Sequence, residues 1–196
     1  RGLGRDDRRR NVYSGFRVDK LERAGGKPSA ARTLTLECKR SGLSDICGLS
    51  PAQYAGDSGF PAKKWADVTT KLVDLDEHRL HYLIPADNHI VIDFDLKNEK
   101  GEKDRELNLA AAAEWPATYA EFSQGGNGVH LHYIYHGDVS KLSRDYAPGI
   151  EVKVFTGNAS LRRRFTYSNG LPVAPISSGL PERKQRVIRT DIVTTE

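Results

Sequence analysis

Hydrophobic and polar residues alternate most regularly in the middle of the chain. His89 to Phe94 and Val129 to Tyr135 each carry apolar side chains at every second position, which predicts two half-buried strands. Glu106 to Trp115 is rich in alanine and leucine and predicts a helix that Pro116 ends. The centre of the chain is therefore expected to combine strands with a helix.

Shorter patterns extend this prediction in both directions. The other predicted strands are Thr33 to Cys38, Arg79 to Ile84, Thr118 to Phe122, Ile150 to Phe155 and Arg164 to Tyr167. Residues 66–75 are predicted to form a short helix or a loop, and Asn127-Gly128 favours the positive φ angles of a hairpin turn. The order of these elements predicts an α+β fold, in which helices pack on a largely antiparallel sheet.

The same pattern suggests how the chain is divided. Residues 1–30 show no sustained periodicity and are interpreted as a basic arm. Residues 31–170 are expected to form one domain, with an N-terminal α/β portion over 31–77 and a core over 78–170. Residues 171–196 are interpreted as a C-terminal extension or linker. Because methionine is absent even at position 1, we expect the chain to be a domain excised from a longer protein.

Composition narrows the class of protein. The chain has 196 residues, of which 38% are hydrophobic and 29% charged, and no apolar run approaches the length of a bilayer span. Its two cysteines cannot form a disulfide framework, so a secreted disulfide scaffold is excluded and a reducing cytoplasm is expected. No membrane partner is expected.

The positive charge is clustered. Residues 1–10 contain five arginines and two aspartates, and three arginines follow one another at 162–164. Such clusters suit a polyanionic partner such as nucleic acid, although a charge this modest by itself favours a solvated surface or tail.

Three segments carry candidate chemistry. In Val91-Ile92-Asp93-Phe94-Asp95, strand alternation places Asp93 and Asp95 on one face, where hard oxygen ligands favour Mg²⁺ or Mn²⁺. The alternative is a pair of solvent-facing aspartates.

The second segment, Ser123 to His132, joins a glycine-rich turn to His-Leu-His. Such backbone can turn its N–H groups toward an anion, and His130 can donate to phosphate. An ordinary hairpin with neighbouring histidines, or a His-x-His metal site, would show the same pattern.

In the third segment, Glu151 and Lys153 point to one face of a strand. Glu151 could complete a carboxylate trio with Asp93 and Asp95, and Lys153 could contact phosphate. A salt bridge between strands is the simpler alternative.

Together the segments VIDFD, SQGGNGVH and IEVKVF resemble, in order, the motifs of the archaeo-eukaryotic primase superfamily, especially the primase-polymerase domains of phage and plasmid replication proteins. The resemblance covers about residues 80–170. It implies an RRM-like, mostly antiparallel sheet that carries the site, beside a small N-terminal α/β portion. It also implies DNA template-directed nucleotidyl transfer by two divalent ions, Mg²⁺ or Mn²⁺, in phage or plasmid DNA replication.

The resemblance assigns roles to particular residues. Asp93, Asp95 and Glu151 become the catalytic metal ligands. The implied nucleotide contacts are Ser123, His130, Lys153 and one of the three arginines at 162–164, for which Arg163 is the choice. No structural zinc is expected, because Cys38 and Cys47 lack a second pair of ligands.

The implied partners are a DNA template and primer, nucleoside triphosphates, and a helicase region in the full-length protein or in trans. The implied location is the cytoplasm of a bacterial host or a phage-infected cell.

Two other functions fit parts of the sequence. His130-Leu131-His132 matches the His-hydrophobic-His motif of HUH-type single-strand endonucleases, which use a metal and a tyrosine nucleophile. A catalytically silent DNA-binding module would keep the basic clusters without three acidic positions in register.

Overall fold

The computed structural model describes residues 33–184, so the arm predicted for residues 1–30 lies outside the described residues. The main sheet has six strands. They are β3 (His89–Phe94), β4 (Ala120–Phe122), β5 (Val129–Tyr135), β6 (Asp145–Ala147), β7 (Ile150–Val154) and β9 (Ala174–Ile176). The strand order is β4-β5-β3-β7-β6, and β9 also pairs with β5. Every pairing is antiparallel except β5 with β9.

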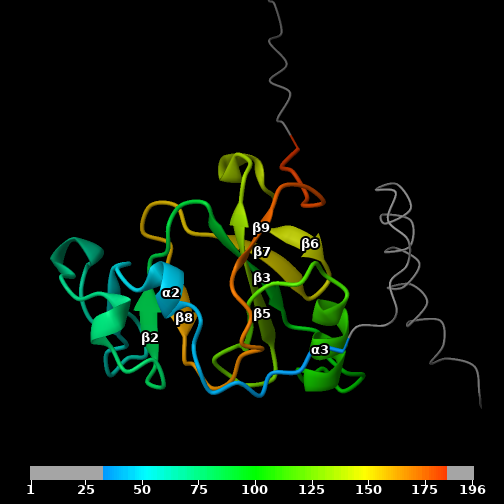
Figure 1. Ribbon diagram of the computed structural model, residues 1–196, viewed down its shortest axis with the longest axis horizontal. Coiled ribbons are helices and arrows are strands. Elements are labelled where there is room, and N and C mark those ends of the chain that lie inside the picture. Colours follow the sequence, from blue (N-terminus) through cyan, green and yellow to red (C-terminus); the bar gives the residue numbers. More distant parts are fainter. Residues whose placement is uncertain (1–32, 185–196) are drawn as a thin grey trace, which may run out of the picture.

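A second sheet of three strands has the order β1-β2-β8. Its strands are β1 (Ala52–Tyr54), β2 (His81–Leu83) and β8 (Leu161–Arg163). The helical elements of this part are α2 (Ser44–Cys47), η1 (Trp65–Asp67) and η2 (Leu72–Asp74). Figure 1 shows this small sheet beside the main sheet, on the opposite side from α3.

The two faces of the main sheet have different cores. Ile90, Ile92 and Phe94 alternate along β3 into a core that includes Ala112 of α3 (Arg105–Ala113). Val91 points to the other face, where it belongs to a core shared with the small sheet and α2. One strand therefore separates an apolar face under α3 from a face that the small sheet partly covers.

The first turn of helix α3 is capped by the side chain that precedes it. The Asp104 carboxylate accepts the Leu107 N–H at 3.1 Å, which caps the first turn.

A further turn, η3, spans Val139–Lys141. Within residues 33–184, no helix is both long and apolar enough to cross a membrane.

The fold is mixed α and β with mostly antiparallel sheets and few helices, which confirms the coarse fold class. The two central strands have the predicted bounds. The strand predicted at Thr33 to Cys38 is wrong, because only Cys38 of this segment pairs, through an isolated bridge to Ser168. The last predicted strand is also misplaced: β8 ends at Arg163, before the predicted start at Arg164.

The predicted division at residues 77 and 170 does not follow the sheets. The small sheet takes β1 from the N-terminal portion, but β2 and β8 from the predicted core. Strand β9, in the predicted extension, pairs with β5 in the main sheet. Residues 66–75, predicted as a short helix or a loop, contain the end of η1 and all of η2, and the other residues of this segment are not helical.

Candidate functional site

A row of polar side chains crosses the main sheet. Glu121 of β4 lies opposite His130 of β5, which lies opposite Asp93 of β3. Asp93 in turn lies opposite Glu151 of β7. Directly opposite residues project from the same face of a sheet, so four neighbouring strands each contribute one titratable side chain to this row. It lies on the face that the small sheet partly covers.

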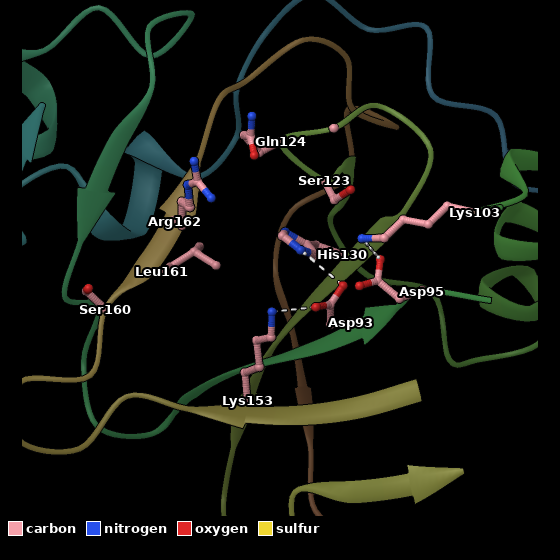
Figure 2. A pocket seen from close by; sticks show the side chains of 11 residues that line it. Asp93, Asp95, Lys103, Ser123, Gln124, His130, Lys153, Ser160, Leu161 and Arg162 are labelled. Atoms are coloured by element: carbon pink, nitrogen blue, oxygen red, sulfur yellow. Dashed lines mark ion pairs between the residues drawn. The ribbon is translucent and has the colours of Figure 1, made fainter. Parts of the chain in front are cut away.

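A pocket of about 330 Å³ opens over this row. Its walls come from β3, β5, β7, the glycine-rich turn after β4, and the start of β8 (Figure 2). The lining residues are Asp93, Asp95, Lys103, Ser123, Gln124, Gly125, His130, Lys153, Ser160, Leu161 and Arg162. Five predicted site residues therefore meet here: Asp93, Asp95, Ser123, His130 and Lys153.

Asp93 is the most strongly held carboxylate of the pocket. Lys153 forms an ion pair with its Oδ2, and His130 Nε2 lies 3.2 Å from its Oδ1. Burial favours the neutral acid, but His130 and Lys153 outweigh it and lower the pKa of Asp93 below its ordinary value. Asp93 is therefore ionised at neutral pH although it is buried.

Asp95 stands at the more open side of the pocket, with 39% of its side chain exposed. Its Oδ1 lies 2.6 Å from Lys103 Nζ. In the described part of the chain, neither Asp93 Oδ1 nor Asp95 Oδ1 accepts a well-formed hydrogen bond, although a basic side chain lies near each. Each aspartate thus has one buried oxygen whose nearest partner is a basic side chain at ion-pair distance rather than a well-aligned hydrogen-bond donor.

The glycine-rich turn approaches these carboxylates closely. A Cβ at Gly128 would lie 2.7 Å from both Asp95 Oδ1 and Ser123 Oγ, so a side chain at this position would displace one of them. Ser123 Oγ accepts the Gly128 N–H at 3.2 Å. The turn is also anchored to α3, because Asn108 donates to Asn127 O at 2.9 Å and Arg105 donates to Gly126 O at 2.8 Å. The glycines therefore let the Ser123 hydroxyl and the Asp95 carboxylate share one wall.

Glu151 is next to Asp93 but does not line the pocket. Arg144 donates to its two carboxylate oxygens at 3.0 and 2.9 Å. The arrangement matches the simpler interpretation of Glu151, a salt bridge between neighbouring residues on the sheet. Its role as a metal ligand stays a prediction.

The nucleotide contact predicted at Arg163 needs correction. The side chain is 1% exposed and lies beneath the surface, not in the pocket. Its guanidinium forms ion pairs with Glu77 and Glu121, and donates to Ser41 Oγ at 2.8 Å. Burial lowers the pKa of Arg163, but the two glutamates raise it above its ordinary value. Its neighbour Arg162 points the other way along β8 and lines the pocket.

A buried chain of polar groups runs behind the pocket. His132 Nε2 lies 3.4 Å from Glu121 Oε1, and His132 Nδ1 lies 2.9 Å from His89 Nε2. Ligand atoms of Glu121, His130 and His132 lie within 4.8 Å of one another, so this group could hold a metal ion. All three residues are buried, and Arg163 already neutralises Glu121.

His89 makes the fold sensitive to acid. Burial, with the nearby His132, lowers its pKa to about 3, whereas an unfolded histidine titrates at about 6.5. Between these values the unfolded chain binds one proton more, so the free energy of unfolding falls by about 1.4 kcal/mol per pH unit as the pH is lowered.

We expect His89→Gln, which cannot titrate, to flatten this dependence by about that slope. Urea unfolding of both proteins at several pH values between 7 and 4 measures the difference. The groups that face His89 (Cys47, His132 and, further away, Glu121) are present in both proteins. Parallel stability curves would contradict the prediction.

The structure adds pocket residues to which the sequence assigns no role: Lys103, Ser160 and Leu161. It also places Gln124 and Gly125 of the glycine-rich turn, and Arg162 of the three consecutive arginines, in the pocket. Lys103 comes from the charged loop between β3 and α3, where no sequence pattern distinguishes one lysine from another. For Arg162 the sequence holds a signal, because the apolar residues Leu161 and Phe165 share one strand parity with Arg163 and leave Arg162 on the opposite face.

Comparison with known proteins assigns no family to the chain. No family model matches the sequence, and the search of curated proteins gave no significant match.

Proposed function

We propose that this chain is a DNA primase-polymerase that transfers nucleotides with the help of two divalent metal ions. One observation carries the proposal: the pocket brings two carboxylates together with a hydroxyl, a histidine and basic side chains. Acidic groups suit metal ions, and cationic or hydroxyl groups suit phosphate. A nucleoside triphosphate with its metal ions presents both charges side by side.

The carboxylates fit divalent ions. Asp93 Oδ1 and Asp95 Oδ1 are buried oxygens that accept no well-formed hydrogen bond from the described residues, and carboxylate oxygen is the ligand type that Mg²⁺ and Mn²⁺ prefer. Asp93 and Asp95 would hold the ions, and Glu151 could join them by giving up its pair with Arg144. When bound, such ions activate the attacking hydroxyl and neutralise the leaving pyrophosphate.

The other pocket residues would orient the nucleotide. His130, Lys153 and Arg162 supply positive charge or N–H donors on the sheet side and at β8, while Ser123 supplies a hydroxyl from the glycine-rich turn. Lys153 and Lys103 form ion pairs with the two aspartates. If those carboxylates held metal ions, both ammonium groups would be available to bind phosphate. The contribution of the protein is mainly positioning and electrostatics.

A second candidate is the HUH-type endonuclease, which the buried Glu121, His130 and His132 group favours. Two observations weigh against it. Glu121 and His132 are fully buried, and no tyrosine is among the pocket residues. Tyr133, a neighbour of His132 in sequence, donates its hydroxyl to Pro116 O at 2.5 Å. The pocket therefore supports nucleotidyl transfer better than tyrosine-dependent cleavage.

The deciding experiment measures extension and cleavage side by side. We expect the chain to extend a primer on a DNA template with Mg²⁺ or Mn²⁺, and His130→Ala to lower kcat/KM for the nucleotide by about 10- to 150-fold. That range corresponds to about 1.5–3 kcal/mol for a hydrogen bond to a charged group. His136→Ala, which removes an exposed histidine beyond the end of the same strand, is the matched control.

Single-strand cleavage with a covalent tyrosine–DNA adduct would overturn the proposal in favour of the endonuclease. DNA binding with neither extension nor cleavage would favour a silent binding module.

A further inference from the structure

A tight loop beside the pocket presents an aromatic ring to solvent. Residues 56–64, here called the Phe60 loop, follow β1 and turn back on themselves. Gly56 N–H donates to Phe60 O at 2.8 Å, and Gly59 N–H donates to Gly56 O at the same distance. Gly59 has a φ of +77°, a conformation that glycine adopts without strain. The Phe60 side chain, at the end of this turn, is 70% exposed.

The loop is held firmly by the small sheet. Gln53 of β1 donates to Lys63 O at 3.0 Å and accepts the Lys63 N–H at 2.7 Å. Tyr82 of β2 donates its hydroxyl to Gly59 O at 2.7 Å. The small sheet thus bonds the loop on both sides of Phe60. A hydrophobic ring that the backbone holds exposed loses little conformational freedom when a partner covers it.

The side chains that bond to the loop lie in one row with a residue of the pocket. Gln53 lies opposite Tyr82, and Tyr82 lies opposite Arg162, so the three form one row on one face of the small sheet. Arg162 lines the pocket, and a Cβ at Gly59 would lie 3.9 Å from its Nη2. The Phe60 loop is therefore the neighbour of the pocket wall that β8 provides.

The chemistry of the loop suits a nucleic acid strand. Lys63 and Lys64 follow Phe60 closely and are both exposed, and the half-buried Trp65 comes next. Single-stranded nucleic acid binds where aromatic rings stack on bases and cations follow the backbone. An exposed leucine, such as Leu49 at 74% exposure, has neither property.

We infer that the Phe60 loop binds single-stranded nucleic acid next to the pocket, with Phe60 stacking on a base and the two lysines contacting phosphates. The inference rests on the proposed function for its choice of partner. Stacking on Phe60 requires an unpaired base, so the strand must be single where it crosses the loop.

The test is equilibrium binding of the full 196-residue chain to a dye-labelled oligothymidylate, followed by fluorescence anisotropy without nucleotide or metal. We expect Phe60→Ala to weaken binding by about 5- to 140-fold, the range that loss of one base–aromatic stack implies. Phe60→Trp should bind as the unchanged chain does. Lys63→Ala with Lys64→Ala should reduce the salt slope of log K by about 0.7 for each phosphate that the chain no longer neutralises.

Leu49→Ala is the matched control, because it also removes an exposed apolar side chain, and it should leave binding unchanged. A labelled duplex should not distinguish Phe60→Ala from the unchanged chain. Equal binding by Phe60→Ala and the unchanged chain to the single strand would overturn the inference. So would a loss that Leu49→Ala shares, or self-association of the chain that Phe60→Ala abolishes, which would assign the loop to a protein partner.

This test does not depend on catalysis. If extension fails but Phe60→Ala loses single-strand binding, the proposed function is overturned and the strand-binding loop is supported. If extension succeeds and Phe60→Ala binds normally, only the inference fails.

Discussion

Replacing Asp93 and Asp95 together by asparagine is expected to lower nucleotide incorporation by at least about 1000-fold. Metal ions contribute several kcal/mol of charge stabilisation in such reactions, and each 1.36 kcal/mol changes a rate tenfold. Asparagine keeps the size of both side chains but removes the negative charge that would bind the ions. Single-nucleotide extension with Mg²⁺ or Mn²⁺ measures the loss.

Two further measurements assign that loss to the metal site. Titration calorimetry with Mn²⁺ should detect binding to the unchanged chain and much weaker binding to the double variant. Asp145→Asn is the matched control, since Asp145 is an exposed carboxylate on the same sheet and lies opposite Glu151. Near-normal extension by the double variant would remove the polymerase assignment.

Arg163→Leu is expected to cost about 3–5 kcal/mol of the free energy of unfolding. The guanidinium is buried between Glu77 and Glu121, and removing one partner of a buried ion pair leaves the other charge uncompensated. Burial raises the pKa of Glu121, but Arg163 and His132 hold it well below its ordinary value. Without Arg163, the buried Glu121 must either keep its charge or take up a proton, and both outcomes lower stability. Urea unfolding measures the change.

Arg162→Leu is the matched control, because it makes the same substitution one position earlier on β8. Arg162 is exposed, so we expect the free energy of unfolding to change by less than about 0.5 kcal/mol, while nucleotide binding weakens. The two variants should therefore separate stability from binding. Similar losses of stability would contradict the opposite orientations of the two side chains.

Strand length decides how well the sequence predicts the bounds of a strand. Strands β3 and β5 have the predicted bounds, because six or seven residues establish an alternating pattern. Of the three-residue strands, β2 and β4 lie within longer predicted strands, whereas β1, β6 and β9 are not predicted from the sequence. Thr33 to Cys38 alternates clearly, yet alternation does not supply the neighbouring strand that a sheet requires.

The prediction of the candidate site is likewise limited by contacts between segments that are distant in the sequence. Local motifs predict Asp93, Ser123 and His130, and β3 with the β4–β5 hairpin brings them together. The resemblance places basic residues just after the third motif, but it does not distinguish Arg163 from its two arginine neighbours. A strand placed at Leu161 would have put Arg163 on the buried face with Leu161 and Phe165. Glu77 and Glu121 neutralise Arg163 and come from distant parts of the chain, so only the tertiary structure reveals these ion pairs.

Strands β4 and β9 divide one edge of β5 between them. β4 pairs with Val129–Leu131, and β9 pairs with Tyr133–Tyr135. During synthesis on the ribosome, β4 therefore emerges well before β9, and half of this edge stays open in the meantime. An open edge can pair with another chain and start aggregation. A shortened form of the protein should consequently extend at least to Leu180, which packs against the main core after β9.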